Sequence, residues 1–386
     1  MEALRERQYF LKWDKSFRIT LLLNKYPLLN KVITILLSSF CKFLRLFFAR
    51  EKKTGVITII NLHRLGDTVF TIPAIEQIYK YYKNFRIFIF CYEDTRDILS
   101  LKFSENDLVS VDKKDFYLYR RIANSHIRKK VKSTNAEIIF DLTGMPASAT
   151  MIFNSSASNI IGMNYRYLKG LYNHFVDIRS EPDFMDIYLD VVKLILPTEH
   201  TSNIKEFPVD LSDKSKILIH PFAIRRSKEW SLRRYVELAA DLFFDYEVEI
   251  VSPPGFISQD VIFEIQKLGI PLIETSSVNE LIDKIKECAL FISNDSGPTY
   301  IASLLGKATY TIYGPTNPNY SHPKGEFHKY YIRKLACSAT SEKFCFTMAG
   351  VYCPSNECLG LITLGTIRDQ VRNLIMKLKL PRKNNR

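Results

Sequence analysis

The sequence lacks the long apolar run that a membrane-spanning helix requires. In the first 50 residues the longest uncharged stretch, 32–41, has ten residues, whereas a spanning helix needs about 20. A cleavable secretory signal is also missing, because the first apolar run begins late, Lys42 and Arg45 interrupt it, and no small-residue cleavage site follows. We therefore expect a cytoplasmic protein without a transmembrane helix.

The cysteines do not form the C-x-x-C pairs of a zinc site. Three of the seven, Cys41, Cys91 and Cys288, lie in apolar surroundings, where a thiol packs as a small hydrophobic side chain. The other four are spaced eight, eight and five residues apart near the C-terminus: Cys337, Cys345, Cys353 and Cys358. We expect a reduced protein that holds neither a metal ion nor another cofactor.

Two further patterns are missing. The turn after the first predicted strand, residues 62–66, has one glycine instead of the G-x-G-x-x-G of a dinucleotide-binding fold. This weakens the case for a dinucleotide-dependent oxidoreductase. No recognisable nucleic-acid-binding module accompanies the positive charge, so we expect no nucleic acid as a partner.

Positive charge is concentrated in the N-terminal segment. Residues 1–50 supply +7 of the net charge of +13, with ten Lys or Arg against three acidic residues. Polar side chains recur there every three or four residues opposite an apolar stripe, which predicts an amphipathic helix with a basic stripe. Such a helix suits an anionic membrane surface; the alternative is a helix packed on the protein's own core, with its Lys and Arg solvated. The polar stripe is Lys31, Thr34, Ser38, Lys42 and Arg45, and the apolar stripe is Ile33, Leu36, Leu37, Phe40, Leu44 and Phe47.

The length and composition indicate two globular domains. The 386 residues are about twice the usual size of one domain, and 46% hydrophobic with 25% charged residues is close to the globular average. Polar, proline-containing stretches between residues 181 and 208 mark a linker. We expect a basic N-terminal segment, an N-terminal lobe, a linker and a C-terminal lobe, over residues 1–54, 55–195, 196–215 and 216–380.

Short apolar runs in both lobes predict α/β folds around parallel sheets that are buried on both faces. In the N-terminal lobe the runs are 56–61, 86–91 and 137–142. In the C-terminal lobe they are 216–220, 247–251, 290–293 and 308–313, with helices near 232–244, 258–268, 278–287 and 298–305. Two successive α/β sheets imply Rossmann-like lobes that face a central cleft, the usual place for a ligand.

The loop after the first strand carries a carboxylate. Asp67 would emerge at the carboxyl edge of the sheet, and Gly66 would let the backbone turn tightly before it. The alternative is that Asp67 or Thr68 simply caps the following helix.

Two loops of the C-terminal lobe combine cations with helix N-termini. Arg225, Arg226 and Lys228 follow the strand at 216–220 and suit a phosphate group, although a solvated basic loop is the alternative. After the strand at 290–293 comes a carboxylate with backbone donors at the start of a helix, which fits a pyrophosphate and sugar hydroxyls but also simple capping. That segment contains Asp295, Ser296, Gly297 and Thr299.

Five motifs, in order and at the predicted strand ends, resemble the lipopolysaccharide heptosyltransferase family over residues 55–375. They are Arg64-Leu65-Gly66-Asp67 with Pro73-Ala74, Asp141-Leu142 with Gly144, Lys228-x-Trp230, Asn294-Asp295-Ser296-Gly297-Pro298, and Tyr313-Gly314-Pro315-Thr316-x-Pro318.

The resemblance implies a GT-B fold and inverting, metal-independent transfer of a heptose from ADP-heptose to a Kdo or heptose acceptor of the lipopolysaccharide inner core. By resemblance, Asp67 is the general base, and Lys228 neutralises charge on the departing diphosphate. Asp295 holds donor-sugar hydroxyls, and Ser296 and Gly297 bind the diphosphate. Further expected donor-binding residues are Arg225, Thr299 and Tyr300, and expected acceptor-side or loop residues are Arg64, Gly66 and Thr316.

The chain departs from the family's pattern at two places. Tyr300 stands where members commonly have a histidine, and tyrosine does not titrate near neutrality. A related transferase that uses another nucleotide sugar is therefore the first alternative; a dinucleotide-dependent oxidoreductase and a non-catalytic anion-binding protein are the others. The basic N-terminal segment also exceeds the family's usual start. We expect it to hold the enzyme near a lipid-linked acceptor, on the inner face of the bacterial inner membrane.

Overall fold

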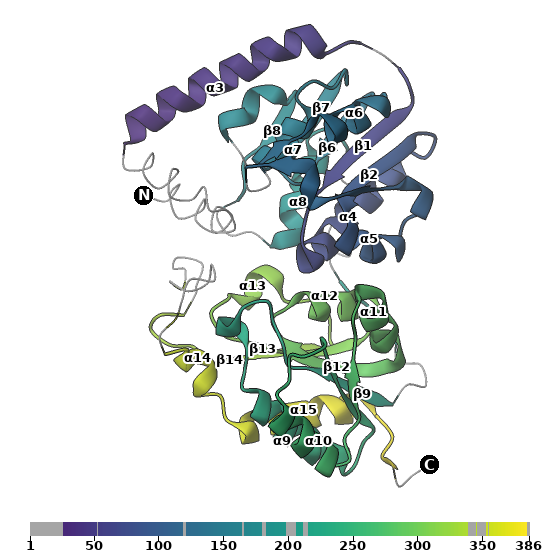
Figure 1. Ribbon diagram of the computed structural model, residues 1–386, viewed down its shortest axis with the longest axis vertical. Coiled ribbons are helices and arrows are strands. Elements are labelled where there is room, and N and C mark those ends of the chain that lie inside the picture. Colours follow the sequence, from purple (N-terminus) through teal and green to yellow (C-terminus); the bar gives the residue numbers. More distant parts are fainter. Residues whose placement is uncertain are drawn as a thin grey trace. The chain divides into compact units, whose positions relative to one another are not determined.

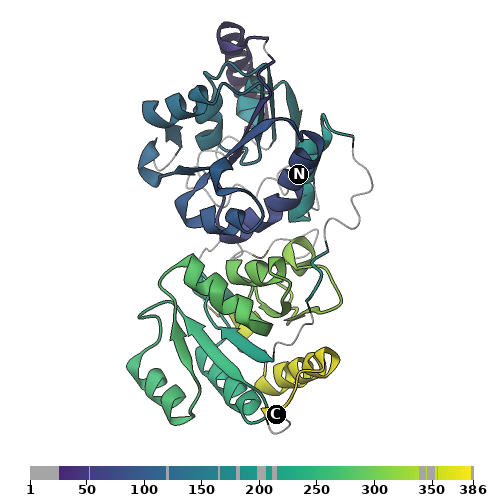
Figure 2. The same cartoon turned by 90° about the vertical axis from the view of Figure 1, so that its right-hand side faces the viewer.

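The structure, a computed structural model, places the chain in two compact units, Met1–Ile204 (unit 1) and Lys205–Arg386 (unit 2) (Figures 1 and 2). The division falls inside the stretch 196–215. Each unit is an α/β fold around its own parallel sheet. The described residues are 26–51, 53–118, 121–163, 166–179, 183–197, 206–210, 215–338, 345, 353 and 355–383.

Unit 1 contains a six-stranded parallel sheet in the order β3-β2-β1-β6-β7-β8. Successive side chains of a strand point to opposite faces, and both Ile59 and Ile60 of β1 are fully buried, so helices cover the sheet on both sides. The strands are β1 (Val56–Asn61), β2 (Arg86–Tyr92), β3 (Leu108–Val111), β6 (Ile138–Asp141), β7 (Asn159–Met163) and β8 (His174–Val176).

Helices and a small hairpin complete unit 1. The helices are α3 (Pro27–Phe48), α4 (Leu65–Tyr81), α5 (Glu93–Ser100), α6 (Ser125–Ser133), α7 (Pro146–Ile152) and α8 (Phe184–Lys193). Short 3-10 turns are η1 (Glu105–Asp107), η2 (Lys113–Asp115) and η3 (Arg166–Leu171), and β4 (Phe116–Tyr117) pairs with β5 (Ile122–Ala123) in an antiparallel hairpin.

Helix α3 forms where an amphipathic helix was predicted, but only part of its polar stripe is exposed to solvent. Arg45 is buried against unit 1, whereas Lys31 and Lys42 are exposed. The predicted alternative, a helix packed on the protein's own core with its Lys and Arg solvated, is confirmed for the packing, since Cys41 belongs to the core of unit 1, and for Lys31 and Lys42; it is wrong for Arg45. No helix among the residues that the structure describes is long and apolar enough to cross a membrane.

Unit 2 repeats the arrangement, with the strand order β11-β10-β9-β12-β13-β14, again parallel. Its strands are β9 (Lys216–His220), β10 (Val248–Ser252), β11 (Leu272–Glu274), β12 (Cys288–Asn294), β13 (Ala308–Tyr313) and β14 (His328–Ile332). Its helices are η5 (Arg226–Lys228), α9 (Leu232–Phe243), α10 (Gln259–Lys267), α11 (Val278–Glu287), α12 (Gly297–Leu304), α13 (Pro318–Ser321), α14 (Glu357–Gly360) and α15 (Leu364–Leu378). The seven predicted strands and the four predicted helices are confirmed to within two residues.

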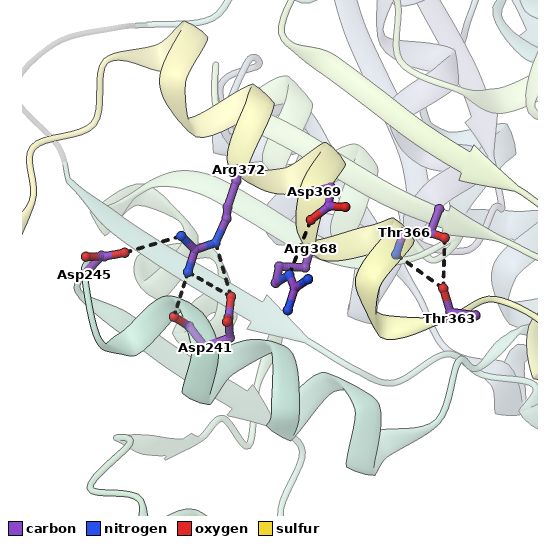
Figure 3. A network of polar contacts seen from close by, with 7 residues as sticks. All are labelled: Asp241, Asp245, Thr363, Thr366, Arg368, Asp369 and Arg372. Atoms are coloured by element: carbon purple, nitrogen blue, oxygen red, sulfur yellow. Dashed lines mark hydrogen bonds and ion pairs between the residues drawn. The ribbon is translucent and has the colours of Figure 1, made fainter.

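The C-terminal helix α15 closes the hydrophobic core of unit 2. Its buried residues include Val371 and Leu374. On its polar side the Arg372 guanidinium donates to the carboxylate of Asp241 at 3.0 Å and pairs with that of Asp245 at 3.5 Å, which ties α15 to the end of α9 (Figure 3).

Both sheets have the strand order of doubly wound folds, in which the strand order reverses between the two central strands. These strands are β1 and β6 in unit 1, and β9 and β12 in unit 2. Ligands of such folds bind at the carboxyl ends of these strands. The loops that follow these four strands are therefore where a site is expected. Four of the five sequence motifs lie after these strands, and the fifth, 313–318, follows β13.

Candidate functional site

Asp295 is the centre of a polar cluster in unit 2. It follows β12 and is 3% exposed. The Lys228 ammonium and the Thr316 hydroxyl each donate to its Oδ2 at 2.6 Å, and the Tyr300 hydroxyl donates to its Oδ1. The donors come from the loop after β9, the loop after β13 and helix α12, so three segments at the carboxyl edge of the sheet meet on one carboxylate.

The protonation of this cluster results from competition between burial and hydrogen bonding. Burial opposes ionisation of Asp295, but the Lys228 ammonium and the donors Thr316 and Tyr300 outweigh it, so the pKa of this carboxyl lies below its ordinary value. Burial and the charge of Asp295 raise the pKa of Tyr300 well above its ordinary value. Asp295 is therefore an anion and Tyr300 a neutral donor at physiological pH.

Asn294 fastens the basic loop that carries Lys228. Its Nδ2 donates to the Pro221 carbonyl oxygen at 2.7 Å, and its Oδ1 accepts from the Trp230 amide at 2.9 Å and the Tyr235 hydroxyl at 3.0 Å. Because Pro221 and Trp230 flank the loop, these bonds hold it at both ends. Sequence reasoning gave Asn294 no role, although its place after a buried strand was a signal.

The basic loop presents its cations at the carboxyl end of β9. Arg225 is half-buried and Arg226 is exposed. The side chain of Lys228 is 18% exposed, and its ammonium carries three N–H donors, of which Asp295 takes one. Lys228 can therefore bind an anion while it remains paired with Asp295.

The N-terminus of α12 lies beside this cluster. Ser296 is its N-cap and Gly297 its first residue, and both are half-buried, whereas residues 291–295 and 298–300 are buried. Thr299 is fully buried. Its hydroxyl donates to the Asn294 carbonyl oxygen at 2.9 Å, and its backbone N–H donates to the Ser296 carbonyl oxygen at 3.1 Å. Ser296 and Gly297, rather than Thr299, are thus the residues of this segment with exposed surface, although the Ser296 hydroxyl oxygen itself is buried. A helix N-terminus attracts negative charge.

In unit 1, Asp67 lies in the first turn of α4, next to the carboxyl end of β1. The helix begins at Leu65 with Arg64 as its N-cap, so neither Asp67 nor Thr68 is the cap. Gly66 has a helical backbone, and the tight turn expected of it is not made there. Asp67 is half-buried and Arg64 exposed. The N-terminus of the helix favours the carboxylate of Asp67 in its charged form.

Two aromatic rings lie within the electrostatic influence of Asp67. His63 packs edge-on against Tyr188 of α8, with 5.1 Å between the ring centroids. Burial lowers the pKa of His63, against the opposing effects of Asp67 and of the Leu142 carbonyl oxygen, 3.0 Å from Nε2. Burial and the charge of Asp67 raise the pKa of Tyr188 well above its ordinary value. Both rings are therefore neutral at pH 7. The sequence did not single out either residue.

A second, buried carboxylate shapes the loop after β6. Asp141 has no exposed surface, and burial raises its pKa in spite of its hydrogen bonds. Gly144 adopts φ +60°, which glycine tolerates. The Thr143 hydroxyl accepts from the Leu62 amide at 2.8 Å, which joins this loop to the one that leads to Asp67. The four donors to Asp141 are the amides of Thr143 and Gly144, at 3.0 Å each, and the hydroxyls of Ser148 at 2.8 Å and Tyr172 at 2.7 Å.

The cysteines are not paired with one another in the described part of the chain, where no disulfide forms. Within the same described residues, no three His, Cys, Asp or Glu side chains gather into a group that could hold a metal ion.

The two units carry complementary chemistry at equivalent edges of their sheets. Unit 2 offers a cation, a helix N-terminus and hydroxyl groups, which together suit a nucleoside diphosphate. Unit 1 offers a half-buried carboxylate. Two Rossmann-like units with these groups at the sheet edges are typical of glycosyltransferases of the GT-B type.

Comparison with known proteins identifies the family. Residues 125–348 match the model of glycosyltransferase family 9 (heptosyltransferase), and the chain belongs to this family. It is 25% identical to lipopolysaccharide heptosyltransferase 1 of Campylobacter coli over 295 residues, which cover 68% of this chain and 85% of the relative.

Solved structures agree on the fold. A family 9 glycosyltransferase from Veillonella parvula superposes with a TM-score of 0.65 at 17% identity, covering 85% of this chain and 99% of that one. An Escherichia coli heptosyltransferase solved with ADP-2-deoxy-2-fluoro heptose gives a TM-score of 0.60 at 15% identity, covering 82% and 99%. The α/β, GT-B type fold predicted from the sequence is thereby confirmed.

Proposed function

We propose that this glycosyltransferase moves a heptose from ADP-heptose to a Kdo or heptose acceptor of the lipopolysaccharide inner core, with inversion and without a metal ion. The relative from Campylobacter coli, named for lipopolysaccharide, supports the acceptor, and the structure with a fluorinated ADP-heptose supports the donor. In this chain the proposal rests on one observation: Lys228 is held by Asp295 next to the N-terminus of α12.

In the proposed reaction, an acceptor hydroxyl attacks the anomeric carbon as the bond from that carbon to the diphosphate oxygen breaks. The electron pair of that bond leaves with ADP, and Asp67 takes the proton of the attacking hydroxyl. Lys228, Arg225 and the N–H groups at Ser296 and Gly297 stabilise the charge that develops on the diphosphate, and this electrostatic role would otherwise need a metal ion.

In this proposal Asp295, Tyr300 and Thr316 do not contact the nucleotide sugar themselves but position the residue that does. The carboxylate of Asp295 is buried under three donors, so its proposed task is to position Lys228 rather than to bind sugar hydroxyls directly. Tyr300 and Thr316 hold Asp295 in turn. Arg64 is exposed at the edge of unit 1 near Asp67 and is proposed to contact the acceptor.

A related transferase that uses another nucleotide sugar is the second candidate. It is favoured by Tyr300, which stands where the resembled family commonly has a histidine and contacts the carboxylate that holds Lys228.

We also propose that the enzyme is cytoplasmic and works peripherally on the inner face of the membrane. An acceptor anchored in lipid presents its sugars there, and residues 1–50 carry an excess of seven positive charges.

The test is an ADP-release assay with a panel of nucleotide sugars. ADP-heptose with a Kdo-bearing or heptose-bearing acceptor is expected to give release that depends on both substrates. Turnover with a different nucleotide sugar and none with ADP-heptose would replace the donor by the second candidate. If chelation of divalent metals abolished turnover, the metal-independent mechanism would be refuted.

A further inference from the structure

Helix α3 exposes its apolar side. Ten large hydrophobic side chains along the helix, here called the outer face, have exposures from 42% at Leu37 to 81% at Leu28. An exposed apolar patch of this length marks an interaction site. The outer face consists of Leu28, Leu29, Val32, Ile35, Leu36, Leu37, Phe40, Phe43, Leu46 and Phe47.

The opposite, polar side of α3 is attached to unit 1. The buried Arg45 guanidinium donates to the carbonyl oxygens of Ser155 and Ala157 at 2.8 and 2.6 Å. Further along, the helix backbone at Ser38 lies so close to Gly170 that a Cβ there would come within 1.8 Å of the Ser38 carbonyl oxygen. Because α3 is bound through its polar side, it cannot turn its outer face inward without leaving Arg45 and two carbonyl groups without their bonds.

The charge around the outer face indicates what it meets. Helix α3 contains no acidic residue, and Lys31 and Lys42 are exposed. They are eleven residues apart, which is close to three helical turns, so both lie along one border of the outer face. An apolar face bordered by lysines matches the boundary between acyl chains and anionic headgroups, since lysine can bury its stem and keep its ammonium in the headgroup layer. The 22 residues form a rod of about 33 Å that can lie flat there.

We propose that α3 is an interfacial membrane helix, whose outer face inserts into the anionic cytoplasmic leaflet while its polar side stays bound to unit 1. Unit 1 is thereby held at a fixed orientation to the bilayer, with the attachment made by apolar side chains and reinforced by Lys31 and Lys42. The inference builds on the proposed membrane location, but vesicle binding needs neither donor nor acceptor and therefore fails or succeeds independently of the transferase assay.

The test measures binding of the full chain to vesicles of phosphatidylethanolamine with phosphatidylglycerol, and to vesicles of phosphatidylcholine. The double variant Phe43→Ser with Leu46→Ser is expected to bind both at least about tenfold more weakly than the wild type, because two apolar side chains no longer insert. Lys31→Ala with Lys42→Ala should weaken binding to the anionic vesicles and leave the weaker binding to phosphatidylcholine unchanged. Phe244→Ser, which removes an equally accessible phenylalanine (83% exposed) from unit 2, is the matched control and should bind like the wild type.

Several results would overturn the proposal. Unchanged vesicle binding by the Phe43 and Leu46 double variant would remove the outer face as the contact. A wild type that ignores vesicles but is a dimer by light scattering, with the double variant monomeric, would assign the face to a second copy of the chain. A monomeric wild type that binds no vesicles would exclude both a membrane and a second copy of the chain as the partner of the outer face.

Discussion

Replacement of Lys228 by methionine tests the ion pair on which the proposed donor site depends. The two side chains are similar in length, but methionine removes the ammonium that lies 2.6 Å from the Asp295 carboxylate. Asp295 would then be a buried anion with hydrogen bonds from Thr316 and Tyr300 but without a countercharge.

The expected cost follows from burial. Removal of one partner of a buried ion pair destabilises a protein by about 3–5 kcal/mol. Because the Lys228 side chain is 18% exposed and two donors to Asp295 remain, we expect the lower end, about 3 kcal/mol, at pH 7. The double variant Lys228→Met with Asp295→Asn leaves no buried charge, so it should lose less than the single variant, about 1–2 kcal/mol.

The pH dependence has a definite sign. In the wild type the pKa of Asp295 lies below its ordinary value of about 4, so its stabilisation is present above that pH and disappears at lower pH. In the Lys228→Met variant no cation offsets the effect of burial on the Asp295 carboxylate, so the pKa of Asp295 should rise above its ordinary value. The stability difference between wild type and variant should therefore be largest near pH 7 and shrink as the pH falls toward about 4.

Tryptophan fluorescence during urea unfolding measures this difference. Trp230 is buried in unit 2, and the other tryptophan, Trp13, can be replaced by phenylalanine so that the signal reports unit 2 alone. A loss below about 1 kcal/mol in the single variant, or a difference that does not change with pH, would refute the argument that Lys228 keeps a buried carboxylate ionised.

Three further substitutions test other contacts. Asp67→Ala should lower kcat by about 10²- to 10⁴-fold and leave donor affinity, measured by calorimetry, unchanged; full activity would exclude Asp67 as the base. Arg45→Met leaves two carbonyl oxygens without their donor and should lower the stability of unit 1, measured by hydrogen exchange, by about 1–3 kcal/mol. The control Arg50→Met replaces an exposed arginine and should change that stability by less than about 0.5 kcal/mol. Equal effects of the two substitutions would contradict the role of Arg45. Tyr300→Phe removes one donor to Asp295 and should cost about 1 kcal/mol at pH 7 in the fluorescence assay, and an unchanged midpoint would show that this bond contributes nothing.

Most of the inner strands were predictable, whereas the inner strand β7 and the edge strands β3, β8, β11 and β14 were not predicted. Strands such as β1 and β13 are continuous apolar or β-branched runs because both of their faces are buried, and such runs are visible in the sequence. The edge strands β8 and β11 have three residues each and are half-exposed. A run this short carries no periodic signal, so pairing with a neighbouring strand, rather than local sequence, makes it a strand.

The residues of the Asp295 cluster could be selected one by one from the sequence, but their contacts could not be predicted. Lys228 and Asp295 were selected because each follows a buried strand, yet they are 67 residues apart, and the adjacency of β9 and β12 that brings them together is a property of the sheet. The same holds for Arg45, which looked like part of a solvated stripe. Its acceptors lie in the loop between α7 and β7, more than 100 residues away, so its burial could not be predicted from the helical pattern.

The two candidate carboxylates differ in what they are able to do. A general base must reach the substrate's proton and accept it. Asp295 accepts three hydrogen bonds, is 3% exposed, and has its pKa lowered by a cation, so protonation would break the contacts that hold Lys228. It is built to remain an anion. Asp67 is half-buried in the first turn of α4, beside the neutral ring of His63, and has surface left for a ligand. Asp67 of unit 1 is therefore the carboxylate expected to accept the proton. Asp295 of unit 2 is expected to hold Lys228 in position for the proposed diphosphate.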